Sequence, residues 1–138
     1  MSSTHIRFWS ATIALSGLLV AGISAAAEDP RSIVDRVYSL AQAERGEARF
    51  KVSCSSCHTP GSFGGGSFAE RWNGQTMAEA FDFVSNAMPE NDPGGLKKQE
   101  YADVLAFILS VNGYPVGNEE LPPDTVALKK LAIVPNPK

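Results

Sequence analysis

The chain has 138 residues, of which 43% are hydrophobic and 20% charged, and this balance is typical of one globular domain. It excludes a disordered or low-complexity protein. The small excess of acidic residues, 15 against 12 basic ones, argues against nucleic acid as a partner.

The first 27 residues have the features of a secretory leader. Arg7 precedes an uncharged stretch, Phe8 to Ala27, whose last three residues are alanines and resemble a cleavage signal. We therefore expect residues 1–27 to be a signal peptide that is removed after export. The alternative is a retained membrane anchor, because the stretch is just long enough to cross a bilayer. The serines and glycines within it favour cleavage.

Cleavage changes the charge of the protein. It removes Arg7 and no acidic residue, so the 12 basic residues become 11 against 15 acidic ones, a net charge of −4. The mature protein would contact a membrane only if the leader stayed attached.

After the leader, residues 28–38 form an approach segment, in which residues 32–37 are compatible with a helical turn. A helix is expected to begin after Ser39, since Ser39 followed three residues later by Gln42 is a capping-box pattern. In that pattern the serine hydroxyl accepts a hydrogen bond from the backbone N–H three residues later, and the glutamine side chain accepts one from the backbone N–H of the serine.

One face of this first helix is expected to be buried. Leu40, Ala43 and Phe50 lie on that face together with Gly46. Gly46 has no side chain one turn before Phe50, which leaves room for another backbone or ring to approach closely. The helix then runs directly into Cys54.

The middle of the chain alternates between loops and helices. Residues 61–66 form a glycine-rich loop without side-chain bulk for a core, and no strand or Gly-Lys-Ser/Thr motif marks it as a phosphate cradle. Residues 67–72 predict a short helix. A second capping box, Thr76 with Glu79, opens a further helix, and Pro89 ends it because the residue before proline is pushed out of helical geometry.

The C-terminal third contains the most apolar helix. It is expected from Lys97 to Asn112, with Gly113 as a stop signal, and its centre, 104–109, is apolar on every side. Such a helix must be covered on more than one face. The first helix can supply one cover, and a large flat apolar cofactor can supply another. The tail, 114–138, is proline-rich, with a short helix expected after Asp124.

The segment Cys54–His58 carries the chemistry. It has the Cys-x-x-Cys-His pattern of covalent haem attachment. On a helical turn the spacing of Cys54 and Cys57 puts both sulfurs on one side, where they can form thioethers with the two vinyl groups of one porphyrin. The adjacent His58 then projects towards the iron.

Two other readings of this motif were considered. A tetrahedral zinc site needs four Cys or His ligands, but the mature chain has only two cysteines and His58, since His5 leaves with the leader. A disulfide is a further alternative in an exported chain, and a thioredoxin-like dithiol needs a strand–helix–strand context. Here a glycine-rich loop follows the motif instead, so haem attachment is favoured.

With His5 lost, no second histidine remains to bind the iron. The sixth ligand is then Met77, Met88, a lysine, water or nothing. Met88 is favoured because Pro89 fixes it in extended geometry at a helix end, whereas Met77 in the first turn of a helix is more simply a packing residue. Methionine opposite histidine raises the reduction potential and fills the coordination sphere, which favours electron transfer over substrate chemistry.

These motifs together resemble the class I, single-haem cytochromes c. The likeness rests on Cys54–His58, Met88–Pro89, and Gly46 with Phe50 ahead of an apolar C-terminal helix, and it covers residues 39–112. It implies an all-α cytochrome c fold in which the N- and C-terminal helices cross, near Val104 and Phe107, around one covalently bound haem c.

The resemblance also implies a domain division and a set of roles. Residues 39–113 would form the cytochrome domain and residues 114–138 a C-terminal extension. Cys54 and Cys57 would hold the haem, and His58 and Met88 would ligate its iron, as cofactor-binding and metal-binding residues respectively. No catalytic residue is implied.

A narrower likeness concerns the biological setting. Segments 41–46, 88–94 and 101–115 are similar to bacterial cytochromes and cytochrome domains associated with quinoprotein and other periplasmic dehydrogenases. This favours a soluble periplasmic electron carrier, not an enzyme, which receives electrons from a dehydrogenase and passes them to a terminal oxidase or another cytochrome.

Two further hypotheses remain open on the sequence. The protein could be a cytochrome subunit held tightly by a periplasmic flavin or quinone-cofactor dehydrogenase, with residues 114–138 as a docking arm outside the core. Alternatively, an iron that Met88 does not bind would suit a haem enzyme or a gas sensor.

Overall fold

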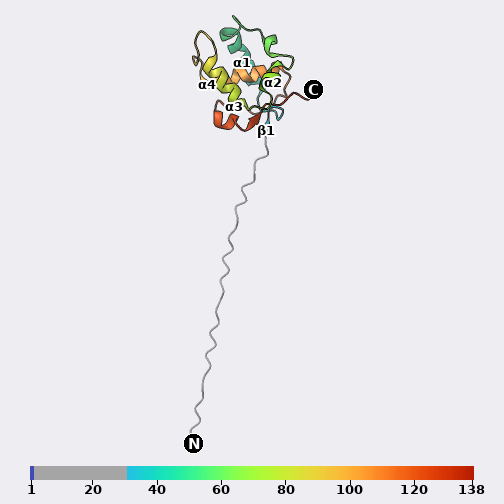
Figure 1. The fold of residues 1–138 in the computed structure, drawn as a ribbon, viewed down its shortest axis with the longest axis vertical. Helices are drawn as coiled ribbons and strands as arrows, with labels where there is room; N and C mark the ends of the chain where they lie inside the picture. The colour runs from blue at the N-terminus through green and yellow to red at the C-terminus, as the bar shows by residue number, and fades with distance from the viewer. Residues whose placement is uncertain (2–30) are drawn as a thin grey trace.

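Helices supply most of the regular structure in the computed structural model, which describes Met1 and residues 31–138 (Figure 1). The predicted leader therefore lies outside the described residues. The helices are α1 (Leu40–Ser53), the 3₁₀ turn η1 (Pro60–Phe63), α2 (Ser67–Trp72), α3 (Met77–Ala87), α4 (Lys98–Val111) and α5 (Thr125–Leu128). The all-α prediction is confirmed, with one minor addition. Two short parallel strands, β1 (Arg31–Ser32) and β2 (Leu131–Ala132), join the two ends of the described chain.

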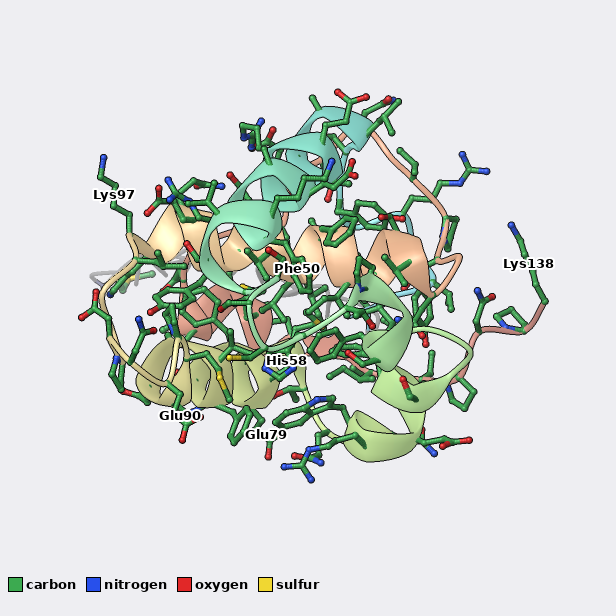
Figure 2. The ribbon with its side chains drawn as sticks, turned by 90° about the horizontal axis from the view of Figure 1, so that it is seen from above. Phe50, His58, Glu79, Glu90, Lys97 and Lys138 are labelled. Carbon is green, nitrogen blue, oxygen red and sulfur yellow. The ribbon has the colours of Figure 1, made fainter. Side chains whose placement is uncertain are left out.

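The crossing of α1 and α4 is the centre of the fold. Figure 2 shows the two helices crossing near Phe50. A Cβ placed on Gly46 would lie 1.9 Å from the carbonyl oxygen of Asp103, so only glycine permits this approach. Next to it, the ring centroids of Phe50 and Phe107 are 5.4 Å apart. The predicted crossing near residue 107 is confirmed.

Leu40 does not share the buried face predicted for it. As the first residue of α1, it lies at the end of the helix and is 58% exposed, whereas Ala43, Gly46 and Phe50 are buried. The apolar centre of α4 behaves as predicted, since residues 104–109 are all buried.

Local capping sets where the helices begin and end. The hydroxyl of Ser39 accepts a hydrogen bond from the Gln42 backbone N–H at 3.1 Å, and the carboxylate of Glu79 accepts one from the Thr76 N–H at 2.7 Å. Helix α3 then ends at Ala87, before the Met88–Pro89 bond. Both predicted helix starts are confirmed.

The side chain of Gln42 has a different partner from the one predicted. It is fully buried, and instead of reaching back to Ser39 it donates to the Leu121 carbonyl at 2.9 Å and accepts from the Leu121 N–H at 2.7 Å. A buried backbone segment needs partners for both its polar groups. Gln42 supplies them for the tail.

In the described part of the approach segment, residues 31–38, β1 leads into a tight turn rather than a helical turn. The carboxylate of Asp35 accepts a hydrogen bond from the Ser32 N–H at 2.6 Å, and this contact closes the turn. The aromatic side chain that follows, Tyr38, is fully buried, and its hydroxyl donates to the Tyr114 carbonyl at 2.6 Å.

The tail is part of the hydrophobic core. Its fully buried side chains are Leu121, Leu128 and Ile133. The guanidinium of Arg45 on α1 bridges to Glu120 in the tail and to Asp103 on α4, at 2.8 and 3.1 Å. The hypothesis that this segment is a docking arm outside the core is therefore corrected, because these side chains are packed within it.

None of the helices within the described part of the chain is both long and apolar enough to span a lipid bilayer.

Candidate functional site

A cavity of about 530 Å³ lies among the C-terminal end of α1, η1, the C-terminal end of α3, and α4. Most of its wall is apolar or sulfur-containing. Its lining consists of Phe50, Phe63, Phe83, Val84, Val104, Ile108, Pro89, Cys54, Cys57, His58 and Met88, with Ser53, Ser56, Glu90 and Asn91 as the polar members. In Figure 2 His58 lies between Phe50 and Glu90.

The turn after α1 places both cysteines and His58 on this wall. The Cys54 N–H continues the helical pattern by donating to the Phe50 carbonyl at 2.9 Å. The N–H groups of Cys57 and His58 then both donate to the Cys54 carbonyl, at 3.1 and 2.9 Å. The chain therefore closes on itself within one turn, and both cysteines are free thiols rather than a disulfide.

The two thiols differ in their surroundings. Cys57 is exposed, whereas Cys54 is half-buried, and this burial raises the pKa of the Cys54 thiol. The positive charge of Arg49, one turn earlier on α1, lowers the pKa and offsets part of that effect. Cys54 is thus the inner of the two cysteines.

Met88 lines the same cavity from the end of α3. Its N–H donates to the Val84 carbonyl at 3.0 Å, and its own carbonyl accepts a hydrogen bond from the Tyr101 hydroxyl at 2.8 Å. Its backbone is extended, with φ of −128° and ψ of 149°. Met77, at the other end of α3, is fully buried in the core and does not line the cavity, which fits the packing role predicted for it.

Comparison with known families agrees with this geometry. Residues 41–108 match the family model described as cytochrome C oxidase, cbb3-type, subunit III. This chain is a c-type cytochrome. The matched region begins in α1 and ends in α4, so it contains both cysteines, His58 and Met88. No curated protein and no solved structure matched the chain.

The donor set and walls of the cytochrome's cavity suit a haem. Two thiols at the spacing of a single turn can form thioethers, the imidazole of His58 can supply a nitrogen ligand, and Met88 can supply a thioether sulfur. A cavity of a few hundred Å³ with mostly apolar walls is also the usual environment of a cofactor of this size. Within the described residues, no cluster of three His, Cys, Asp or Glu side chains offers a different metal site.

Sequence reasoning missed Phe63 as a member of the site. The loop 61–66 was expected to contribute no bulk, yet the Phe63 ring lies on the cavity wall. Its centroid is 5.3 Å from that of the His58 ring and 6.0 Å from that of the Phe50 ring, which it meets edge-on at 89°. The signal was present in the sequence as the one aromatic residue in a glycine- and serine-rich loop.

Few charges surround the cavity. Among the described lining residues only Glu90 is charged, and it is exposed. A positive charge lies just outside the wall, where the guanidinium of Arg71 is 5.2 Å from the Trp72 ring centroid and 5.5 Å from that of Phe83. Because Phe83 lines the cavity, Arg71 is in contact with its wall from outside.

Proposed function

We propose that this cytochrome is a periplasmic carrier of single electrons, with one haem c attached to Cys54 and Cys57 and with His58 and Met88 as iron ligands. One observation carries the proposal: the fold brings both cysteines, His58 and Met88 to a single apolar cavity, although Met88 comes from a different helix. The bound haem supplies an iron that accepts and returns one electron.

The residues of the chain fix the properties of that iron. His58 provides a nitrogen ligand, and the soft sulfur of Met88 favours the reduced state and so raises the reduction potential. If His58 and Met88 both bind the iron, no open position would remain for a substrate. This arrangement suits a carrier rather than an enzyme.

The apolar side chains of the wall exclude water. Phe50 and Val104 are buried, and Phe63 and Ile108 complete the wall beside them. A site with few polar groups reorganises little when one charge is added or removed, and its low polarity also disfavours the more highly charged state of the iron. Arg71, in contact with the wall through Phe83, would add a positive charge beside the site when the negatively charged haem is bound.

Electron exchange would take place at the exposed part of the site. Cys57 is exposed and Phe83 is 42% exposed, so the cavity reaches the protein surface beside these two residues. A partner would dock there over a small area, as in other short-lived redox encounters. No covalent change in the partner is needed.

The proposed location and partners follow from the leader and from the resemblance. The leader supports export to the periplasm, where a dehydrogenase would be the donor and a terminal oxidase or another cytochrome the acceptor. The matched family model is described as a subunit of an oxidase, which supports a place in an electron-transfer chain. A membrane contact is expected only if the leader is retained.

The second hypothesis is a tightly held subunit of a dehydrogenase, and the structural feature that suggested it is not present in the described tail. It relied on a free tail, and the described tail is fastened to α1 through Gln42 and Arg45. Copurification of a larger subunit at near-equal stoichiometry would restore it. A monodisperse monomer from native periplasm would exclude it.

The proposal is tested on the full chain expressed in a host that attaches haem c. The purified protein should carry one haem that survives denaturing electrophoresis, should show a six-coordinate low-spin spectrum, and should be titrated by a single one-electron step. A high-spin spectrum in the purified, fully loaded protein would contradict the proposed ligation.

A further inference from the structure

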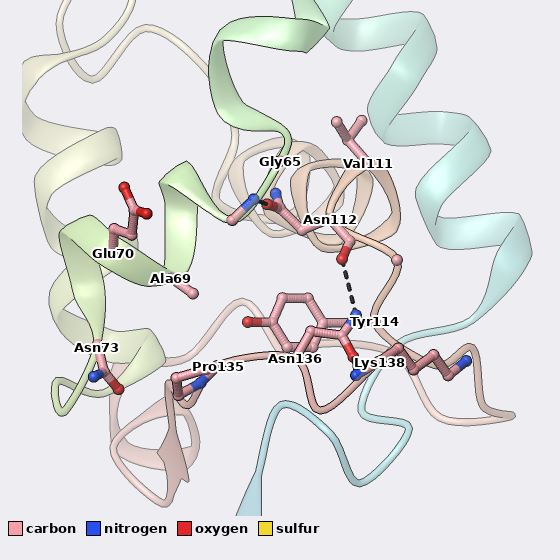
Figure 3. A pocket seen from close by; sticks show the side chains of 12 residues that line it. Gly65, Ala69, Glu70, Asn73, Val111, Asn112, Tyr114, Pro135, Asn136 and Lys138 are labelled. Atoms are coloured by element: carbon pink, nitrogen blue, oxygen red, sulfur yellow. Dashed lines mark hydrogen bonds between the residues drawn. The ribbon is translucent and has the colours of Figure 1, made fainter.

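Asn112, at the C-terminal end of α4, fastens the loop that follows the haem-binding motif. Its amide nitrogen donates to the Phe63 carbonyl at 2.6 Å. Its amide oxygen accepts from the Gly66 N–H at 3.3 Å, and this second bond is drawn in Figure 3. Among the described residues, these are the only hydrogen bonds that join loop 59–66 to a distant part of the chain. Asn112 therefore holds the loop at two points.

Apart from the packing of the Phe63 ring, the loop has little else to fix its shape. Four of the six residues 61–66 are glycines, and Gly65 and Gly66 have positive φ angles of 65° and 92°. Glycine backbones have the greatest conformational freedom, so an ordered position here must come from contacts. The remaining hydrogen bonds of the loop are local, such as that from the Gly64 N–H to the Gly61 carbonyl.

Asn112 is itself held in one orientation. Its amide nitrogen also donates to the Ile108 carbonyl at 2.8 Å, one turn earlier on α4. Its backbone carbonyl accepts a hydrogen bond from the side chain of Asn136 at 2.9 Å, as Figure 3 shows. Asn112 and Asn136 both line the open cleft beside them, of about 790 Å³, and their side-chain amides already have hydrogen-bond partners within the protein.

The loop carries Phe63, whose ring contacts the His58 ring at a centroid distance of 5.3 Å. Because the amide of Asn112 binds the backbone of Phe63, it sets where that ring stands against the imidazole. We infer that Asn112 is a positioning residue for the haem ligand: through Phe63 it fixes the orientation of the His58 ring. This inference rests on the proposed function, in which His58 binds the iron.

The test uses electron paramagnetic resonance of the ferric holoprotein, because the anisotropy of the low-spin signal reports the orientation of the axial imidazole. Asn112→Asp is nearly isosteric and keeps the acceptor for Gly66, but it replaces the donor to Phe63 with a second oxygen. We expect a shifted or broadened low-spin signal and an altered midpoint potential. The matched control, Asn136→Ala, removes a bond to the backbone carbonyl of Asn112 but leaves the bonds of the Asn112 side-chain amide to Phe63, Gly66 and Ile108 in place, so both readouts should be unchanged.

A second variant keeps the test decisive if Asn112→Asp does not fold. Phe63→Leu retains the backbone carbonyl that Asn112 binds but removes the ring, so it should shift the same signal. If Asn112 acts through Phe63, the double variant Asn112→Asp/Phe63→Leu should shift the low-spin signal no further than Phe63→Leu alone.

Two results would overturn the inference. One is an unchanged signal and potential in Asn112→Asp despite a lower melting temperature, which would indicate a purely structural role. The other is an unchanged signal in Phe63→Leu. Failure of the proposed function is distinguishable from both, because the wild-type protein would then lack a low-spin histidine-ligated haem from the outset.

Discussion

The two ends of helix α1 have contrasting surroundings. At the C-terminal end, Phe50 and Cys54 border an apolar cavity that is lined by sulfur atoms and an imidazole. Towards the N-terminal end, Gln42 and Arg45 bind the tail through hydrogen bonds and an ion pair. We refer to Cys54, Cys57, His58 and Met88 as the cavity group. One helix thus serves both a chemical site and a structural fastening.

This contrast predicts that the haem spectrum and reduction potential respond to changes at one end of α1, and the free energy of unfolding to changes at the other. Changes in the cavity group should alter the haem spectrum or the reduction potential more than the free energy of unfolding. Changes where the tail is fastened, at Tyr38, Gln42 and Arg45, should lower stability while leaving the spectrum unchanged. The following predictions test that separation, beginning with the largest effect.

Replacing both attachment cysteines should abolish covalent haem binding. In Cys54→Ser/Cys57→Ser no thiol is left to form a thioether, so haem staining after denaturing electrophoresis should be lost completely. The control is Ser56→Ala, a change at a lining residue between the two cysteines, which should stain like the wild type. Staining that persisted in the double variant would disprove the attachment.

Replacing Met88 should change the iron without unfolding the protein. In Met88→Ala the loss of the sulfur ligand should lower the midpoint potential by on the order of 0.1 V, within the span of about 0.8 V over which axial ligands set haem potentials. Potentiometric titration measures this shift. Met77→Leu is the matched control. It should leave the midpoint potential unchanged and lower the free energy of unfolding by less than about 1.5 kcal/mol, because Met77 is a packing residue in the core. Equal potentials in Met88→Ala and the wild type would argue against ligation.

Replacing Gly46 should loosen the helix crossing that lies between the two ends of α1. In Gly46→Ala the added Cβ would overlap the Asp103 carbonyl, so the free energy of unfolding should fall by about 3 kcal/mol. Chemical denaturation of the holoprotein measures it. Gly61→Ala, whose added Cβ would meet only the Thr59 hydroxyl at 3.9 Å, should change stability by less than about 0.5 kcal/mol. Similar losses in both would remove the special role of the crossing.

Replacing Gln42 should weaken the tail and spare the haem. Gln42→Leu leaves the N–H and carbonyl of Leu121 buried without partners, at a cost of about 2 kcal/mol. The visible spectrum should be unchanged. Gln75→Leu removes a single exposed hydrogen bond, to the Arg71 carbonyl, and should cost much less. A spectral change in Gln42→Leu would show that the two ends of α1 are coupled.

High pH should reveal a smaller effect where the tail is fastened. Burial raises the pKa of Tyr38 and of Tyr114 above the ordinary value of 10.0. The unfolded chain therefore loses these protons first. The contribution of the two tyrosines to stability is constant below about pH 10 and falls as the pH rises further, by at most about 1.4 kcal/mol per pH unit for each tyrosine.

Tyr38→Phe isolates one of these contributions. It removes the hydrogen bond to the Tyr114 carbonyl, at a cost of about 1 kcal/mol at neutral pH, and should make the alkaline decline shallower. Unfolding free energies measured between pH 9 and 11 check this expectation. An equally steep decline in Tyr38→Phe would mean that Tyr38 is not one of its sources.

The features that were predictable from the sequence depend on residues that lie close together along the chain. Ser39 and Thr76 mark helix starts because capping acts over three residues, and the Cys54–His58 motif places three groups within one turn. Gly46 predicted a close approach, and the approaching backbone proved to be that of α4.

The features that escaped prediction depend on contacts between distant segments. Gln42 pairs with Leu121, 79 residues away, and β1 pairs with β2 across the whole described chain. The buried tail residues are scattered among prolines without a helical or alternating period, so their burial left no local pattern. Phe63 was missed because a glycine-rich loop was treated as lacking bulk, although its one aromatic ring reaches the cavity.

The most direct test of the central claim is the reaction of the reduced protein with carbon monoxide. If Met88 fills the sixth position, the spectrum of the reduced wild-type holoprotein should be almost unchanged at neutral pH. Met88→Ala should shift fully to the carbon monoxide complex. Complete binding by the wild type, equal to that of the variant, would show that the iron is open and that the protein is not the six-coordinate electron carrier proposed here.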